Sequence, residues 1–105
     1  MDLIKNMLEI YGNLSGHRFK GAITATRFVK LASMPGMVND KLTKIDYDLV
    51  FKKILRNNFN KQQMDFYDFI AAIEELASRL ESGYDSENKL PAVSSLVNKI
   101  INHIQ

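Results

Sequence analysis

Apolar residues recur along the chain at the three- and four-residue spacing of amphipathic helices. The first such stretch follows Asp2, a suitable N-cap, and we expect Gly12 to end it. Its apolar positions are Leu3, Ile4, Met7, Leu8 and Tyr11. A second helix is expected after Thr24, because Phe28, Leu31 and Ala32 follow at helical spacing and Pro35 can stop it.

Three further helices are expected in the rest of the chain. Thr43 with Asp46 resembles a capping box before a third helix, whose apolar positions are Ile45, Leu49, Val50, Phe51 and Ile54. Asp65 can cap a fourth, and its stripe is Phe66, Phe69, Ile70, Ile73, Leu76, Ala77 and Leu80. A fifth is expected over about residues 90–104. No long stretch alternates with period two, so the pattern predicts an all-α single domain over residues 1–105.

The sequence also repeats weakly at an offset of 41 residues. Ile23 and Thr24 align with Met64 and Asp65, and each half contains a helix, a polar loop, one apolar residue, a cap and a helix. This order is typical of paired EF-hands, in which the apolar loop residues of the two units pair with each other. A generic helical bundle could imitate the pattern. We expect two degenerate EF-hand-like units, with the C-terminal helix in their cleft or along their core.

The two loops lack the ligands that calcium requires. An EF-hand loop needs oxygen ligands at positions 1, 3 and 5, glycine at 6 and glutamate at 12. With Ile23 and Met64 at position 8, the first loop has Gly16, Arg18, Lys20 and Arg27 at positions 1, 3, 5 and 12. The second has Asn57, Phe59, Lys61 and Asp68 at the same positions. We therefore expect no calcium binding.

The composition narrows the possible chemistry further. There is no cysteine, which excludes disulfides and thiolate metal sites and favours a reducing, cytoplasmic compartment. His17 and His103 have no nearby acidic or nucleophilic partners, so neither a metal site, a cofactor site nor a catalytic triad is expected, and we predict no enzyme activity. The apolar runs are far too short to span a bilayer, and no signal peptide or nucleic-acid reader motif is present.

Charge is divided unevenly between the two parts of the sequence. Residues 1–61 contain 11 basic and 5 acidic side chains, a balance of +6, whereas residues 62–105 contain 3 and 7, a balance of −4. Together they give the net charge of +2. Such an asymmetry can direct an acidic partner to one face, although two differently solvated surfaces would give the same counts.

Three ordered blocks resemble a known family. They are residues 23–32 (ITATRFVKLA), 41–54 (KLTKIDYDLVFKKI) and 64–77 (MDFYDFIAAIEELA). In order and spacing they are similar to the core domain of the tubulin polymerisation-promoting protein family, and the likeness extends over about residues 5–100.

The resemblance implies an EF-hand-like fold and a microtubule-associated function. The family binds tubulin and microtubules and promotes their polymerisation and bundling, and its members occur widely in organisms with cilia or flagella. Vertebrate members also carry a basic, glycine-rich tail implicated in tubulin contact, which this sequence lacks before it ends at Gln105. Vertebrate cores have His and Cys residues associated with zinc, but the matching helix here has Thr24 and Ala32, so zinc binding is not expected.

We therefore expect a non-enzymatic protein of the cytoplasm and cytoskeleton, in a cilium or flagellum where one is present. It would bind tubulin or microtubules and promote or stabilise their assembly, without nucleic-acid or membrane partners. The acidic tails of tubulin would meet basic residues of the first 61 positions, and the candidates are Arg18, Lys20, Arg27, Lys30, Lys52, Lys53 and Arg56. The last three could instead stabilise the C-terminus of a helix. The alternative is an EF-hand-like scaffold whose groove binds an amphipathic helix of another protein.

Overall fold

The computed structural model describes residues 2–16, 21–56, 62–81 and 84–104. Within these ranges the chain forms α1 (Leu3–Ser15), α2 (Ala25–Val29), the 3-10 helix η1 (Lys30–Ser33), α3 (Lys44–Leu55), α4 (Phe66–Leu80) and α5 (Leu90–Ile104). The described residues contain isolated β-bridges but no named strand. The fold is therefore all-α, as the sequence predicts.

Side-chain caps begin the helices where the sequence places them. At α3, the Asp46 N–H donates to Thr43 Oγ1 (3.4 Å) and the Thr43 N–H donates back to Asp46 Oδ2 (2.7 Å). At α4, Asp68 N–H donates to Asp65 Oδ1 (2.8 Å) and Asp65 N–H to Asp68 Oδ2 (3.1 Å). Both are reciprocal capping boxes, which satisfy backbone donors that have no partner within the helix. Side-chain oxygens also cap α1 and α2, at Asp2 and Thr24.

The first helix is longer than its sequence suggests. The prediction that Gly12 ends it is wrong, because α1 continues to Ser15 and ends at Gly16. Gly16 has φ +79°, a left-handed conformation that glycine adopts without a Cβ penalty, and its N–H bonds to the Gly12 carbonyl at 2.9 Å. The extra turn buries Leu14, which is 7% exposed, so packing outweighs the weak helix propensity of one glycine.

The predicted pairing between the two repeats is present. The Ile23 N–H donates to the Met64 carbonyl and the Met64 N–H donates to the Ile23 carbonyl, both at 2.8 Å. Both side chains are fully buried. This antiparallel bridge joins the segments that precede α2 and α4, and it is the contact expected of two EF-hand-like units.

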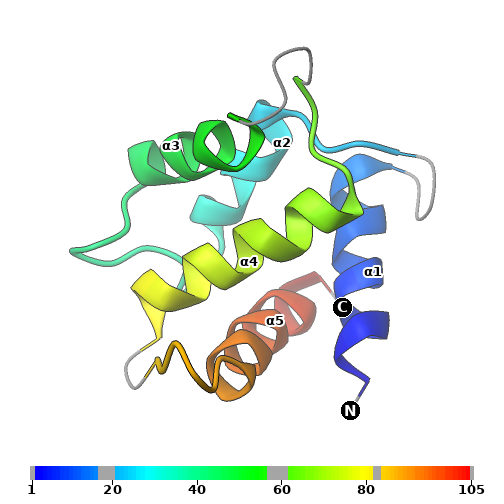
Figure 1. Ribbon diagram of the computed structural model, residues 1–105. Coiled ribbons are helices and arrows are strands. Elements are labelled where there is room, and N and C mark those ends of the chain that lie inside the picture. Colours follow the sequence, from blue (N-terminus) through cyan, green and yellow to red (C-terminus); the bar gives the residue numbers. More distant parts are fainter. Residues whose placement is uncertain (1, 17–20, 57–61, 82–83, 105) are drawn as a thin grey trace.

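The C-terminal helix is part of the core. In Figure 1, α5 runs beside α4, and it packs against both α1 and α4. One apolar face of α5 is buried, comprising Ala92, Val93, Leu96, Val97, Ile100 and Ile101. The sequence-based expectation that this helix lies along the core is therefore confirmed.

Helix α3 is buried on one side only, and its inward residues differ from the pattern read in the sequence. Tyr47 is fully buried, packs against Phe28 with 5.9 Å between ring centroids, and donates its hydroxyl to the Met37 carbonyl. Burial raises the pKa of Tyr47. In contrast, Ile45 is 74% exposed and Leu49 is 53% exposed. The apolar positions of α3 therefore face in two directions.

Replacing Ile100 with alanine tests the contribution of α5. Ile100 is fully buried, so Ile100→Ala should lower the free energy of unfolding by about 2–5 kcal/mol, through lost apolar burial and the cavity left behind. Urea denaturation with far-UV circular dichroism gives the measurement. The matched control is Ile45→Ala, which should change stability by no more than about 0.5 kcal/mol because the side chain is mostly in solvent. Equal losses in both variants would contradict this description of α5.

Candidate functional site

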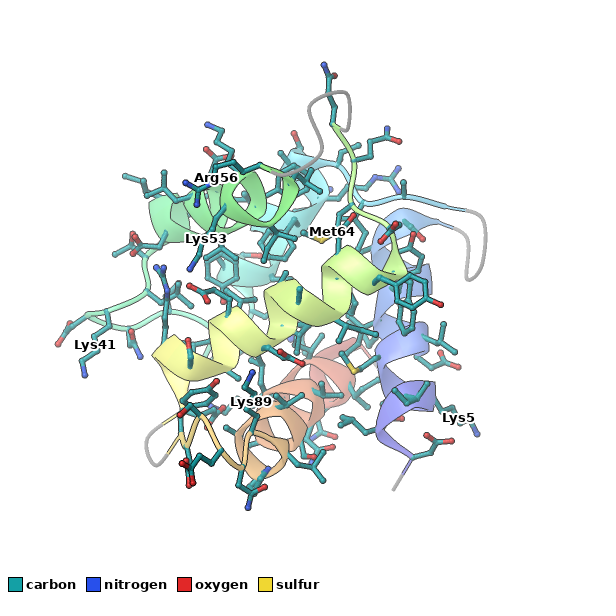
Figure 2. The ribbon with its side chains drawn as sticks, in the orientation of Figure 1. Lys5, Lys41, Lys53, Arg56, Met64 and Lys89 are labelled. Atoms are coloured by element: carbon teal, nitrogen blue, oxygen red, sulfur yellow. The ribbon has the colours of Figure 1, made fainter. Side chains whose placement is uncertain are left out.

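The basic residues singled out in the sequence occupy different settings in the structure. Arg18 and Lys20 lie outside the described residues. Lys53 and Arg56 lie on and just after the last turn of α3 (Figure 2). The remaining candidates lie on α2, η1 and α3 at Arg27, Lys30 and Lys52. Their ion pairs and hydrogen bonds separate those committed to the fold from those available to a partner.

Arg27 stabilises the end of α1. Its Nη1 donates to the Leu14 carbonyl at 3.1 Å, and this carbonyl belongs to the last turn of the helix. The last four carbonyls of a helix have no partner within it, so the guanidinium satisfies one of them and carries a favourable charge there. Arg27 is therefore a structural link between α1 and α2.

Lys53 is also held within the fold. Its Nζ lies 2.8 Å from Glu75 Oε1 on α4, and Arg79 Nη2 lies 3.1 Å from the same oxygen. The hydrogen bond from Lys53 is the largest cause of the lowered pKa of the Glu75 carboxyl, and the bond from Arg79 adds to it. This cluster joins α3 to α4, so Lys53 is a weaker candidate for partner binding than its neighbours.

Lys52 has a looser attachment to the fold. Its Nζ lies 2.8 Å from Asp48 Oδ2, one turn earlier on the same helix. The Lys52 side chain is 69% exposed, and exposed pairs of this kind contribute only about 0.3–0.5 kcal/mol. A partner carboxylate could therefore replace Asp48 at little cost.

Most acidic side chains of residues 62–105 either form an ion pair or cap a helix. Glu74 pairs with Lys89 at 3.6 Å and Glu81 with Lys99 at 2.9 Å, in addition to the Glu75 cluster. Asp65 and Asp68 cap α4. The cations of the first half are compensated less, since no ion pair to a described residue is present at Lys5, Lys30, Lys41, Lys44 or Arg56. The charge asymmetry of the sequence thus leaves an excess of cations at the surface.

Several of these cations surround the outward face of α3. Consecutive helical residues are rotated by 100°, so a helix that turns Tyr47, Val50 and Phe51 inward must turn four others outward. These are Ile45, Leu49, Lys52 and Arg56, and we call them the α3 outer face. Leu49, Lys52 and Arg56 also line a shallow hollow together with Lys53. The result is an apolar strip with cations toward the C-terminal end of the helix.

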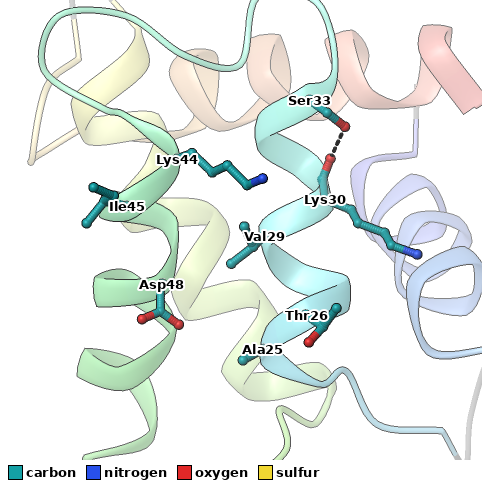
Figure 3. Close-up of a pocket in the computed structure, with 8 residues that line it drawn as sticks. All are labelled: Ala25, Thr26, Val29, Lys30, Ser33, Lys44, Ile45 and Asp48. Atoms are coloured by element: carbon teal, nitrogen blue, oxygen red, sulfur yellow. Dashed lines mark hydrogen bonds between the residues drawn. The ribbon is translucent and has the colours of Figure 1, made fainter.

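A groove lies beside this strip, between α3 and the α2–η1 segment. Figure 3 shows its lining, which consists of Ala25, Thr26, Val29, Lys30, Ser33, Lys44, Ile45 and Asp48. The sequence pattern did not indicate Lys44, nor that Ile45 and Leu49 are exposed. A helical wheel of α3 with Tyr47 inward places Ile45 and Leu49 on the opposite face, whereas the position of Lys44 beside the groove depends on how α2 packs against α3.

The acidic and histidine side chains of the described residues do not gather into a metal centre. Among them there is no group of three or more His, Cys, Asp or Glu side chains that could hold a metal ion. The carboxylate pairs Asp46 with Asp48 and Asp65 with Asp68 each include a helix cap. Residues 17–20 and 57–61 of the proposed calcium-free loops lie outside the described part, so the absence of calcium binding stays a prediction. No helix in the described ranges is long and apolar enough to cross a membrane.

The ion pairs of Glu75 should make the stability of the protein depend on pH. The pKa of the Glu75 carboxyl is lowered in the folded protein, so the unfolded chain binds the proton more readily and the free energy of unfolding rises with pH. The stabilisation from the ionised Glu75 carboxylate is fully present above 4.5, the ordinary pKa of a glutamate, and is lost as the pH falls through the lower pKa of the folded state. We expect Glu75→Gln to cost about 0.5–1 kcal/mol at neutral pH and less at about pH 3, which is below the ordinary value of 4.5.

Urea denaturation at the two pH values measures this difference. Glu87→Gln is the matched control, because Glu87 is exposed and forms no ion pair with any residue that the structure describes. The control should unfold like the parent protein at both pH values. A loss of equal size at both pH values in Glu75→Gln would mean that Glu75 acts through packing and not through its charge.

Comparison with known proteins assigns the family. The p25-alpha family matches residues 11–104, which include the three blocks that resemble the tubulin polymerisation-promoting proteins. No match was found to a curated protein or to a solved structure. The match covers most of the 105 residues, from the last turns of α1 to the end of α5. This chain therefore belongs to the p25-alpha family, the family of the tubulin polymerisation-promoting proteins.

Proposed function

We propose that this chain is a non-enzymatic protein that binds tubulin or microtubules and promotes or stabilises microtubule assembly. Membership of the p25-alpha family supports a tubulin-associated role. The observation that carries the proposal is the set of exposed cations that form no ion pair with another described helix, at Lys30 on η1 and on the α3 outer face at Lys52 and Arg56. The proposed place of action is the cytoskeleton, including that of a cilium or flagellum.

The cations proposed to bind tubulin are accessible to an acidic partner. Lys30 and Arg56 form no ion pair with a described residue, and Lys52 is bound only to an exposed carboxylate on its own helix. Such groups attract an acidic surface through fields that salt screens, with a Debye length of about 8 Å at physiological strength. The acidic tails of tubulin have the complementary charge. This surface therefore favours rapid, salt-sensitive association over deep burial.

The alternative, a scaffold that binds an amphipathic helix in an EF-hand-like cleft, has less support. Such a scaffold needs an open apolar surface between its helices. Here α5 packs against both α1 and α4, and apolar side chains of those two helices, including Met7 and Leu76, are buried. A partner helix would first have to displace α5, whose own apolar face is buried against the same helices.

Microtubule co-sedimentation tests the proposal. Binding should weaken steeply between about 0.05 M and about 0.3 M salt, because the cations are exposed and their fields are screened. The triple variant Lys30→Gln, Lys52→Gln, Arg56→Gln should bind at least about tenfold more weakly at the lower salt, which corresponds to 1.4 kcal/mol. Circular dichroism must show that the variant is folded.

A second triple variant controls for the change in total charge. Lys5→Gln, Lys89→Gln, Lys99→Gln also removes three cations, so both variants have a net charge of +2 − 3 = −1. Its sites lie on α1, just before α5, and on α5, away from the α3 outer face. This control should retain most of the binding. Equal loss in both variants, or co-sedimentation that does not respond to salt, would falsify the proposed surface.

A further inference from the structure

The groove between α3 and the α2–η1 segment has features of a binding site for a particular kind of peptide. It has a volume of about 610 Å³, within the range of about 300–1,000 Å³ that is typical of ligand sites. In Figure 3, Val29 points from α2 toward α3, and Lys44 points from α3 toward α2. Ile45 and Lys30 lie at opposite edges of the groove.

One part of the groove is apolar without being covered by the chain. Ala25 and Val29 are half-buried, and Ile45 is 74% exposed although it is a large aliphatic side chain. Leu49 extends this apolar surface by one turn along α3 and is 53% exposed. Single exposed apolar residues are common, but a contiguous set beside a groove marks an interaction site more often.

The free charges around this apolar surface are all positive. Lys44 reaches across the groove from α3, whereas the side chain of Lys30 extends from η1 away from α3 (Figure 3), and neither lysine forms an ion pair with a residue in the described ranges. The lining contains one carboxylate, Asp48, and its Oδ2 is already bound to Lys52 Nζ at 2.8 Å. A ligand would therefore have to bring its own negative charge to pair with Lys44.

We propose that this groove binds an acidic peptide segment that carries one bulky apolar side chain. The apolar side chain packs against Val29 and Ile45, and a carboxylate beside it pairs with Lys44. The lining contains no aromatic ring on which a nucleic-acid base could stack, which favours a peptide over a single-stranded nucleic acid. The inference goes beyond the proposed function, because it concerns any partner that presents such a segment.

Two fluorescein-labelled synthetic peptides of equal length and equal glutamate content provide the test. One has a central phenylalanine and the other has serine at that place, so they differ in the apolar group alone. Fluorescence anisotropy at low salt should show at least about tenfold tighter binding of the phenylalanine peptide, which is 1.4 kcal/mol. Amide shifts of Val29 and Ile45 should change when this peptide is added. A labelled oligothymidylate of equal charge should bind more weakly than either peptide.

Two variants with matched controls locate the binding in the groove. Ile45→Ser should remove the preference for phenylalanine, whereas Ile4→Ser, at an isoleucine on α1 that is 54% exposed, should retain it. Lys44→Gln should weaken binding of both peptides, whereas Lys5→Gln, on α1, should change it little. Both changed residues are exposed, so the fold should survive, and circular dichroism checks this.

Three results would overturn the inference. They are equal affinity for the two peptides, a phenylalanine preference that Ile45→Ser leaves intact, and tighter binding of the oligothymidylate. None of them bears on microtubule co-sedimentation, because its test variant changes Lys30, Lys52 and Arg56 and leaves Ile45 and Lys44 in place. Conversely, a protein that fails to co-sediment with microtubules can still discriminate between the two peptides.

Discussion

Two backbone hydrogen bonds between Ile23 and Met64 determine how the two helical units meet. Each residue immediately precedes an N-cap, Thr24 or Asp65, so the bridge brings the beginnings of α2 and α4 together. The bonds are enclosed by fully buried side chains, and breaking them without replacement would leave buried donors and acceptors unpaired, at about 1–3 kcal/mol each. The direction in which α2 and α4 leave the bridge then decides where α1, α3 and α5 can pack.

The proposed binding surface exists because α3 is buried on only one side. Tyr47 anchors its inner face through ring packing and a hydrogen bond to the Met37 carbonyl. The opposite face then has to lie outward, and it presents Ile45, Leu49 and the cations that follow them. The rigid placement of α3 thus pre-orients these side chains, which reduces the entropy that a partner would have to remove on binding.

Ion pairing refines which cations are available. Lys52 and Lys53 are neighbours in the sequence and were indistinguishable as candidates. In the structure, Lys53 reaches Glu75 on α4, whereas Lys52 pairs within its own helix. The sequence did not indicate a role for Lys44, the first residue of α3, because its position beside the groove depends on how α2 packs against α3. The sequence therefore predicted that residues 1–61 would present a basic surface, but it did not predict which lysines and arginines form it.

The sequence alone determined the all-α class, the caps at Thr24, Thr43 and Asp65, and the pairing of the two repeats. The class and the caps follow from local periodicity and short-range hydrogen bonding, which act within a few residues. The pairing was indicated by the repeat at an offset of 41 residues, in which Ile23 aligns with Met64. It also indicated the family, through three blocks of residues. Only the tertiary structure decided that α1 continues past Gly12, because the burial of Leu14 is a contact between distant segments. Only the tertiary structure decided that Ile45 is exposed. Helix α3 has apolar residues on two faces, and the face that its neighbouring helices can cover is the one that turns inward.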